Sequence, residues 1–189
     1  FHSIIYFDSK VRLSHEGAFN KVFGNQGRGN GQFLNPTGIT CGEETELSGN
    51  YYYPIYIADY YNFRIDRVTY VVPGTSSTSG YIDPDTFTSF ENVLYPYSVA
   101  FIKDSAGVSN KLWVSEAHPT TPFISCYDAG SGELVQRFCG YYDNNTGTLQ
   151  EFQPGTFSRI ATYNEYFRAV SFVDNIRNCL VTCLLDNTG

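Results

Sequence analysis

The chain has 189 residues, of which 42% are hydrophobic and 17% aromatic, and its 12 Lys+Arg and 19 Asp+Glu give a formal net charge of −7. An acidic chain with scattered basic residues lacks the electrostatic footprint of nucleic-acid binding and has no basic patch for anionic membranes. No apolar run approaches the roughly 20 residues that a membrane helix needs. We therefore expect no nucleic-acid partner and no membrane insertion.

The composition favours short β-strands over helices, because 16 Tyr, 15 Phe and 17 Gly suit strands joined by tight turns. In chain order we predict strands at 3–7, 10–14 and 18–23, then at 37–41, 55–58, 64–70 and, more weakly, 81–82. Further strands are predicted at 98–103, 111–115, 123–127 and 134–138, then at 157–162, 169–172 and 178–185. Residues 24–33, 43–53 and 73–80 are expected to form loops.

An apolar strand that ends in an acidic residue and is followed by another strand occurs four times. The acidic residues stand at intervals of 51, 57 and 58 residues (8 to 59, 59 to 116 and 116 to 174), and they are Asp8, Asp59, Glu116 and Asp174. One small meander of strands has no second layer to bury its apolar face, so such units are expected to pack against one another. A period of this length indicates a repeat architecture.

The stretch 23–65 resembles an NHL repeat of the β-propeller superfamily. It contains Phe-Gly-x-x-Gly-x-Gly-x-Gly-x-Phe from Phe23, then Asn-Pro-Thr-Gly-Ile from Asn35, then Ile-Ala-Asp-x-x-Asn-x-Arg-Ile from Ile57. The resemblance implies an all-β propeller of NHL type with about four blades, the first and last incomplete: 1–24, 25–82, 83–140 and 141–189. We expect the chain to be a segment of a larger propeller, with a subunit that receives strands from a partner as the alternative.

The repeated acidic residues are expected to stabilise turns at strand ends by accepting backbone N–H bonds, as Asp does in turns. The alternative is a ring of carboxylates that holds a metal such as Ca²⁺. Arg64 is expected to pair with Asp59 inside one blade. The three histidines are scattered along the sequence, and there is no Gly-x-Ser-x-Gly elbow, no P-loop and no Cys/His pair at recognisable spacing. We therefore predict no catalytic residue, metal or cofactor.

Cys126 and Cys139 flank a predicted turn between neighbouring strands, and we predict a disulfide between them, with free thiols as the alternative. Asn144 begins an N-glycosylation sequon in a polar loop that should be exposed. With the acidic, Tyr-rich composition, these features favour an extracellular or cell-surface location.

Five tyrosines in or beside loops are candidates for a contact surface, because exposed Tyr is favoured at protein interfaces: Tyr52, Tyr60, Tyr61, Tyr141 and Tyr142. We predict a non-enzymatic protein-interaction or structural module that binds protein partners or assembles with itself. One alternative is a metal-dependent enzyme resembling the NHL-like lyases that cleave peptidyl-hydroxyglycine, although the sequence shows no matching histidine set. The other alternative is a glycan-binding propeller.

Overall fold

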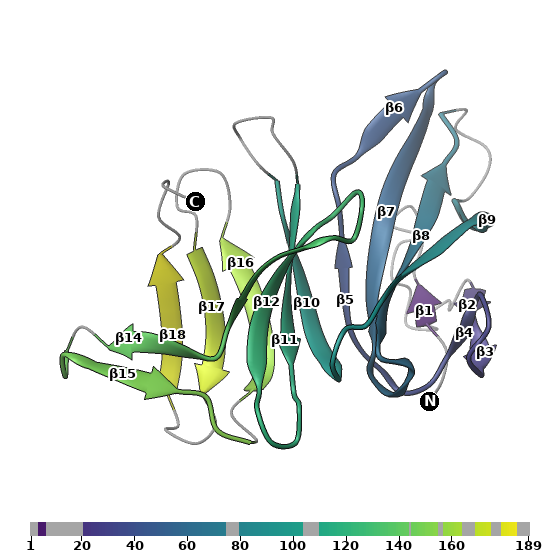
Figure 1. The fold of residues 1–189 in the computed structure, drawn as a ribbon. Coiled ribbons are helices and arrows are strands. Elements are labelled where there is room, and N and C mark those ends of the chain that lie inside the picture. Colours follow the sequence, from purple (N-terminus) through teal and green to yellow (C-terminus); the bar gives the residue numbers. More distant parts are fainter. Residues whose placement is uncertain are drawn as a thin grey trace, which may run out of the picture.

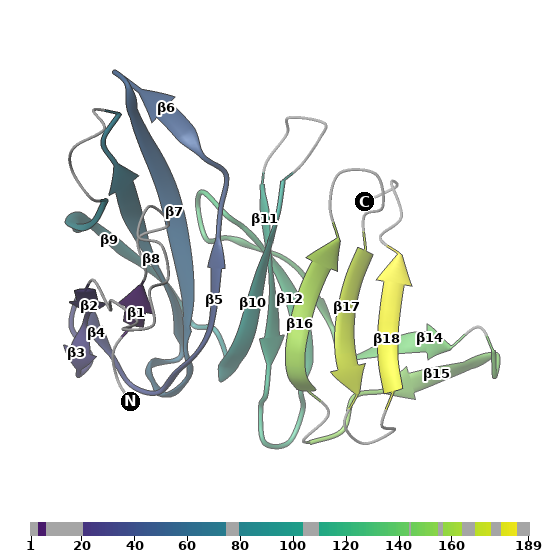
Figure 2. The same ribbon diagram turned by 180° about the vertical axis from the view of Figure 1, so that it is seen from behind.

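The computed structural model describes residues 4–6, 21–74, 80–103, 110–143, 145–154, 157–163, 169–174 and 179–184. These residues form β-strands in several antiparallel sheets, with one 3-10 turn, η1 (Tyr60–Asn62), and no α-helix among them. Three larger sheets lie side by side in chain order, and none of the described sheets closes on itself (Figures 1 and 2). Within these ranges, no helix has the length and apolar character needed to span a bilayer.

The first sheet contains β5 (Pro36–Cys41), β7 (Asn50–Asp59), β8 (Arg64–Val72) and β9 (Tyr81–Glu91) in that order, and β6 (Thr45–Leu47) pairs with the start of β7. Two of these strands are much longer than the sequence predicts, since β7 begins at Asn50 and β9 runs across the boundary expected at residue 82. Pro84 weakens the strand pattern in β9. It is tolerated there because β9 lies at the edge of this sheet among the strands that the structure describes.

The middle sheet contains β10 (Pro96–Ile102), β11 (Lys111–Glu116), β12 (Phe123–Asp128) and β13 (Leu134–Phe138). The last sheet contains β16 (Phe157–Tyr163), β17 (Ala169–Asp174) and β18 (Cys179–Leu184). These strands confirm the predicted ones to within one or two residues at each end, because alternating apolar residues between Gly-rich and Pro-rich turns mark them clearly.

Three strand pairs are small. β1 (Ile4–Tyr6) pairs with β2 (Lys21–Phe23), and β3 (Asn25–Gln26) runs parallel to β4 (Gln32–Phe33). The third pair is a hairpin of β14 (Gly140–Asp143) and β15 (Thr148–Glu151). The hairpin lies in a stretch that the sequence analysis assigns to an exposed loop.

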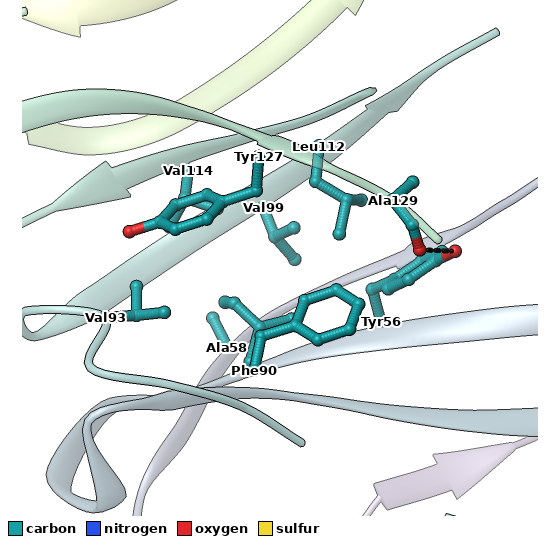
Figure 3. Packing of buried hydrophobic residues seen from close by; sticks show 10 residues of the cluster. Tyr56, Ala58, Phe90, Val93, Val99, Leu112, Val114, Tyr127 and Ala129 are labelled. Atoms are coloured by element: carbon teal, nitrogen blue, oxygen red, sulfur yellow. Dashed lines mark hydrogen bonds between the residues drawn. The ribbon is translucent and has the colours of Figure 1, made fainter. Parts of the chain in front are cut away.

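The middle sheet is packed on both faces, because successive side chains of a strand point to opposite sides. One face lies against the first sheet, where Val99, Leu112 and Val114 meet Ala58 and Phe90 (Figure 3). The other face lies against the last sheet, through a cluster that consists of Ala100, Ile102, Trp113, Ile124, Cys126, Phe152, Phe172 and Val181. The far face of the first sheet is covered by Phe23 and Phe33 of the preceding segment.

The first strands of the three sheets are neighbours, with β10 contacting β5 on one side and β16 on the other (Figure 2). Gly38 permits this approach, since a Cβ at this position would lie 2.8 Å from Ser98 Cα. The Thr37 hydroxyl also donates a hydrogen bond to the Pro96 carbonyl oxygen at 3.1 Å. Because backbone meets backbone here, the contact leaves no room for a side chain at position 38 of β5.

Candidate functional site

The acidic residues of the first and middle sheets occupy equivalent places. Asp59 ends β7 opposite Pro36, and Glu116 ends β11 opposite Pro96, with a β-bulge just after each proline. The residue before each proline has a left-handed backbone, with φ of 64° at Asn35 and 53° at Tyr95. The two sheets therefore begin with the same turn.

Each carboxylate accepts a backbone hydrogen bond from this turn. Leu34 N–H donates to Asp59 Oδ1 at 2.7 Å, and Leu94 N–H donates to Glu116 Oε2 at 2.7 Å. Both carboxylates are fully buried. A buried carboxylate is stable only when it is paired and hydrogen-bonded, so these residues stabilise the turn in which they lie.

Arg64 connects Asp59 to the Gly-rich loop that precedes β5. Its guanidinium lies 3.6 Å from Asp59 Oδ2 and 2.9 Å from Asp66 Oδ1. The same guanidinium donates hydrogen bonds of 2.9, 3.2 and 2.9 Å to the carbonyl oxygens of Arg28, Gly29 and Gln32. Asn62 adds a hydrogen bond to the Gly27 carbonyl oxygen at 2.9 Å. The Phe-Gly to Asp to Arg motif is thus one connected structural unit.

Sequence reasoning missed Asp66, which completes this buried cluster. Residues two apart in a strand share a face, and this alternation is the signal that would place Asp66 beside Arg64. Ser89 donates a hydrogen bond to Asp66 Oδ1 at 2.6 Å. Burial, opposed in part by Ser89 and Arg64, raises the pKa of Asp66 to about 7. Two carboxyl groups therefore share one guanidinium in this cluster.

In the middle sheet, the guanidinium comes from a residue that the sequence analysis did not select. Arg137 Nη2 donates to Glu116 Oε1 at 3.0 Å and to the Tyr127 hydroxyl at 3.1 Å. The Tyr127 hydroxyl donates to Glu116 Oε1 at 3.0 Å, and burial is the largest cause of the raised pKa of Tyr127. Arg137 lies on β13, 21 residues after Glu116, so no local spacing identifies it.

Other predicted site residues lie outside the described part of the chain. Asp8 and the glycosylation candidate Asn144 are in stretches that the structure does not describe. The backbone of Asp174 is placed at the end of β17, opposite Phe157, as Asp59 and Glu116 are opposite their own first strands. This backbone register is all that the structure adds for the fourth acidic position.

The predicted disulfide between Cys126 and Cys139 is not formed, and both residues are free thiols. Cys126 is buried opposite Gln136, and Cys139 is exposed just after β13. The two cysteines are therefore not cross-strand partners. Burial raises the pKa of Cys126 to about 11.

The five candidate tyrosines fall into different environments. Tyr52 is half-buried in β7, and Tyr141 packs on Phe152 and Phe172 in the cluster between the middle and last sheets. Tyr142 is 62% exposed on the β14–β15 hairpin, where its hydroxyl donates to the Gly147 carbonyl oxygen. Tyr60 and Tyr61 lie together in η1, directly after Asp59. This last pair belongs to a group of rings that is partly exposed to solvent.

That group is a half-exposed aromatic patch at the ends of the first and middle sheets. We use "aromatic patch" for Tyr60, Tyr61, Phe63, Tyr95, Tyr97 and His118. The Tyr60 ring lies 4.8 Å from that of Tyr61 and 5.5 Å from that of Tyr95, measured between centroids. Tyr61 is 49% exposed. The patch therefore spans two sheets and presents ring surface to solvent.

The acidic turns hold the patch in place. Tyr60 and His118 follow Asp59 and Glu116 closely, and Tyr95 precedes the Pro96 that pairs with Glu116. The His118 ring packs against Tyr95 at 5.6 Å, and its Nδ1 accepts a hydrogen bond from Thr121 N–H at 3.2 Å. Burial raises the pKa of Tyr60, and its tyrosine neighbours raise it further. The rings are thus positioned by two turns, each of which is held by a buried carboxylate paired with an arginine.

Comparison of the chain with protein-family models, curated proteins and solved structures finds no match. The resemblance to NHL repeats therefore stays a prediction that rests on the motifs between residues 23 and 65. Within the described ranges, no three His, Cys, Asp or Glu residues come together in a group that could hold a metal ion.

Proposed function

We propose that this chain is a protein-binding module in which the three larger sheets are blades of an NHL-type propeller and the aromatic patch is the contact surface. The patch is the observation that carries the proposal. Its rings come from two sheets, they are held at fixed distances from one another, and Tyr61 is half exposed.

Three features support the propeller arrangement. The middle sheet is a four-stranded meander, and the first sheet is a meander of β5, β7, β8 and β9 to which β6 is added. Both begin with the same left-handed residue, proline and bulge. Their first strands are adjacent, and β16 continues this row. The middle sheet is covered on both faces by its neighbours, as a blade is in a radial array. Propellers present loops at the ends of their blades, and the aromatic patch lies at such an end.

The chemistry of the patch suits a protein partner. Tyrosine offers a large ring with a polar hydroxyl and loses little side-chain entropy on binding, so it is enriched at interface centres. Ring faces also attract Lys and Arg side chains, and the net charge of −7 favours a partner with basic groups. We expect a partner surface that combines apolar and basic side chains, and we expect to find it outside the cell.

Photo-crosslinking tests this proposal. A benzophenone side chain at position 61 should capture a partner from a native extract, whereas the same group at position 81 should not. Tyr81 is the matched control because it is 42% exposed on β9 of the same sheet and lies outside the patch. With the captured protein purified, Tyr61→Ser should weaken binding about tenfold or more, as expected for a central interface aromatic, and Tyr81→Ser should not.

Three outcomes would refute the proposal. The first is a chain that captures no protein through position 61. The second is an affinity that Tyr61→Ser and Tyr81→Ser change equally. The third is Tyr61-dependent binding on a glycan array without any protein partner, which would show that the aromatic patch binds glycans.

A further inference from the structure

A second feature, separate from the aromatic patch, is a cleft where the space between the first and middle sheets opens to solvent. Its volume is about 300 Å³, and its walls come from β7 and β8 on one side and from β10 and the β12–β13 turn on the other. The cleft adjoins the buried cluster of Figure 3, since Tyr56 and Ala129 of that cluster line it. No residue of the aromatic patch lines it.

Two aromatic rings form the apolar part of the cleft. Tyr56 and Phe101 are stacked with centroids 6.2 Å apart and ring planes at 13°. The Tyr56 hydroxyl donates to the Ala129 carbonyl oxygen at 2.9 Å, which ties the ring to the opposite sheet (Figure 3). Burial raises the pKa of Tyr56. Tyr56 is only 2% exposed, so the apolar surface that a ligand can reach is that of the half-buried Phe101 ring, which stacks on it.

The acidic residues in the walls already have partners. Glu43 pairs with Lys103 at 2.5 Å and accepts a hydrogen bond from Asn110 at 3.1 Å. Asp128 Oδ1 accepts the backbone N–H groups of Gly130 and Ser131 at 3.0 and 2.8 Å. Asp128 Oδ2 lies 3.7 Å from Lys111 Nζ, so the charges of both carboxylates are balanced locally.

Arg67 is the exception among the charged residues of the cleft. It lies directly opposite Tyr56 on β8, and its guanidinium carbon is 5.9 Å from the centre of the Tyr56 ring. Across the part of the chain that the structure describes, the guanidinium has this ring contact but no hydrogen bond or ion pair. Its five N–H donors, arranged in a planar fork, are therefore available to a ligand in the cleft.

We propose that this cleft binds a small organic carboxylate with a flat apolar body. The carboxylate pairs with the fork of Arg67, because guanidinium and carboxylate match in a bidentate geometry. The body of the ligand lies against Phe101, whose ring is stacked on the buried Tyr56. A monoanion fits better than a phosphate dianion, since Arg67 carries the one unbalanced positive charge among the described residues that line the cleft, and two carboxylates stand in the walls.

Benzoate is the probe that tests this inference. A titration followed by backbone amide NMR shifts should show saturable binding, with the largest changes at Tyr56, Arg67, Phe101 and Ala129. Benzamide, which is neutral and has the same shape, should bind about tenfold or more weakly, as the loss of a charge-assisted hydrogen bond implies. Phenyl phosphate should bind no more tightly than benzoate.

Variants separate the role of the guanidinium from general effects. Arg67→Gln should weaken benzoate binding about tenfold or more, while Arg67→Lys should have an intermediate effect because it keeps the charge and loses the fork. Arg28→Gln, at an exposed arginine outside the cleft, is the matched control and should bind as the wild type does. The same spectra report whether each variant is folded.

The inference is overturned if benzamide binds as tightly as benzoate, if Arg67→Gln leaves the affinity unchanged, or if no saturable shifts arise at this cleft. Tighter binding of phenyl phosphate would overturn the choice of a carboxylate. Tyr61→Ser should leave benzoate binding intact, so failure here is distinguishable from failure of the aromatic patch.

Discussion

The first and middle sheets stabilise the same kind of turn with different residues. Each has a buried carboxylate at the end of its second strand that accepts a backbone N–H from the turn before the first strand. In the first sheet, Arg64 is the cross-strand neighbour of Asp59. In the middle sheet that position is occupied by Phe123, and the guanidinium of Arg137 reaches over the Phe123 ring at 5.0 Å.

The difference shows what the turn requires. A carboxylate near the Leu amide and a guanidinium near the carboxylate are present in both sheets, whereas the strand that supplies the arginine is not the same. Glu116 has a longer side chain than Asp59, and Arg137 comes from a strand that is not adjacent to that of Glu116, whereas Arg64 lies on the strand next to Asp59. The two sheets therefore have the same pairing of carboxylate and guanidinium, although the arginine does not occupy the same place in the sequence pattern.

The two clusters also differ in how much charge they bury. The Arg64 side chain is 7% exposed and lies beside two fully buried carboxylates, Asp59 and Asp66. The Arg137 side chain is 27% exposed and pairs with one. The first cluster consequently depends more strongly on its guanidinium.

The largest expected effect follows from this difference. Arg64→Met should lower the free energy of unfolding by about 3–5 kcal/mol, because it leaves buried carboxylates without a counter-charge. Arg137→Met should cost about 1–2 kcal/mol, since water can reach the more exposed site and Tyr127 still donates to Glu116. Urea unfolding at pH 7, followed by circular dichroism, measures both values. An equal or larger loss in Arg137→Met would contradict the comparison.

An intermediate effect is expected where the two first strands touch. β5 has Gly38 at the position where β10 has Ser98, and each residue follows its bulge. Gly38→Ala should destabilise the protein by about 1–3 kcal/mol, because the added methyl group would press on the backbone of β10.

Gly29→Ala is the control for this substitution. Its new Cβ would meet only the movable tip of Gln32, at 3.2 Å, and we expect a change within about 0.5 kcal/mol. Equal unfolding midpoints for the two variants would show that β5 and β10 are not in close backbone contact.

The smallest effect, counted per pH unit, concerns the pH dependence of stability, because only the first cluster contributes a second carboxyl group to it. With its pKa raised to about 7 in the folded protein, mainly by burial, Asp66 holds a proton that the unfolded chain has released. Stability should therefore fall as pH rises from about 5 to 7, by at most about 1.4 kcal/mol per pH unit.

Asp66→Asn should remove this contribution and flatten the curve of unfolding free energy against pH. Asp85→Asn, on the exposed surface of β9, controls for the loss of one formal charge and should keep the wild-type slope. A wild-type slope in Asp66→Asn would show that Asp66 does not carry the extra proton.

Sequence reasoning correctly predicted part of the fold and part of the candidate site. It located most strands of the middle and last sheets and selected Asp59, Arg64 and Glu116, because strand alternation and turn residues are local signals. It missed most of β9, where Pro84 interrupts the pattern. It also paired Cys126 with Cys139, whereas the register places Cys126 opposite Gln136. Register depends on the exact length of the turn, which composition does not fix.

The sequence by itself determined that the chain is all-β and where its acidic turns lie, since both follow from the identity of neighbouring residues. Only the tertiary structure decided that Arg137 pairs with Glu116 and that Asp66 pairs with Arg64. It also decided that the rings of Tyr60 and Tyr95, which come from two sheets, are in contact. Such groupings depend on which strands become neighbours in space. That outcome is set by the burial of whole sheet faces and is not encoded in any short stretch of the chain.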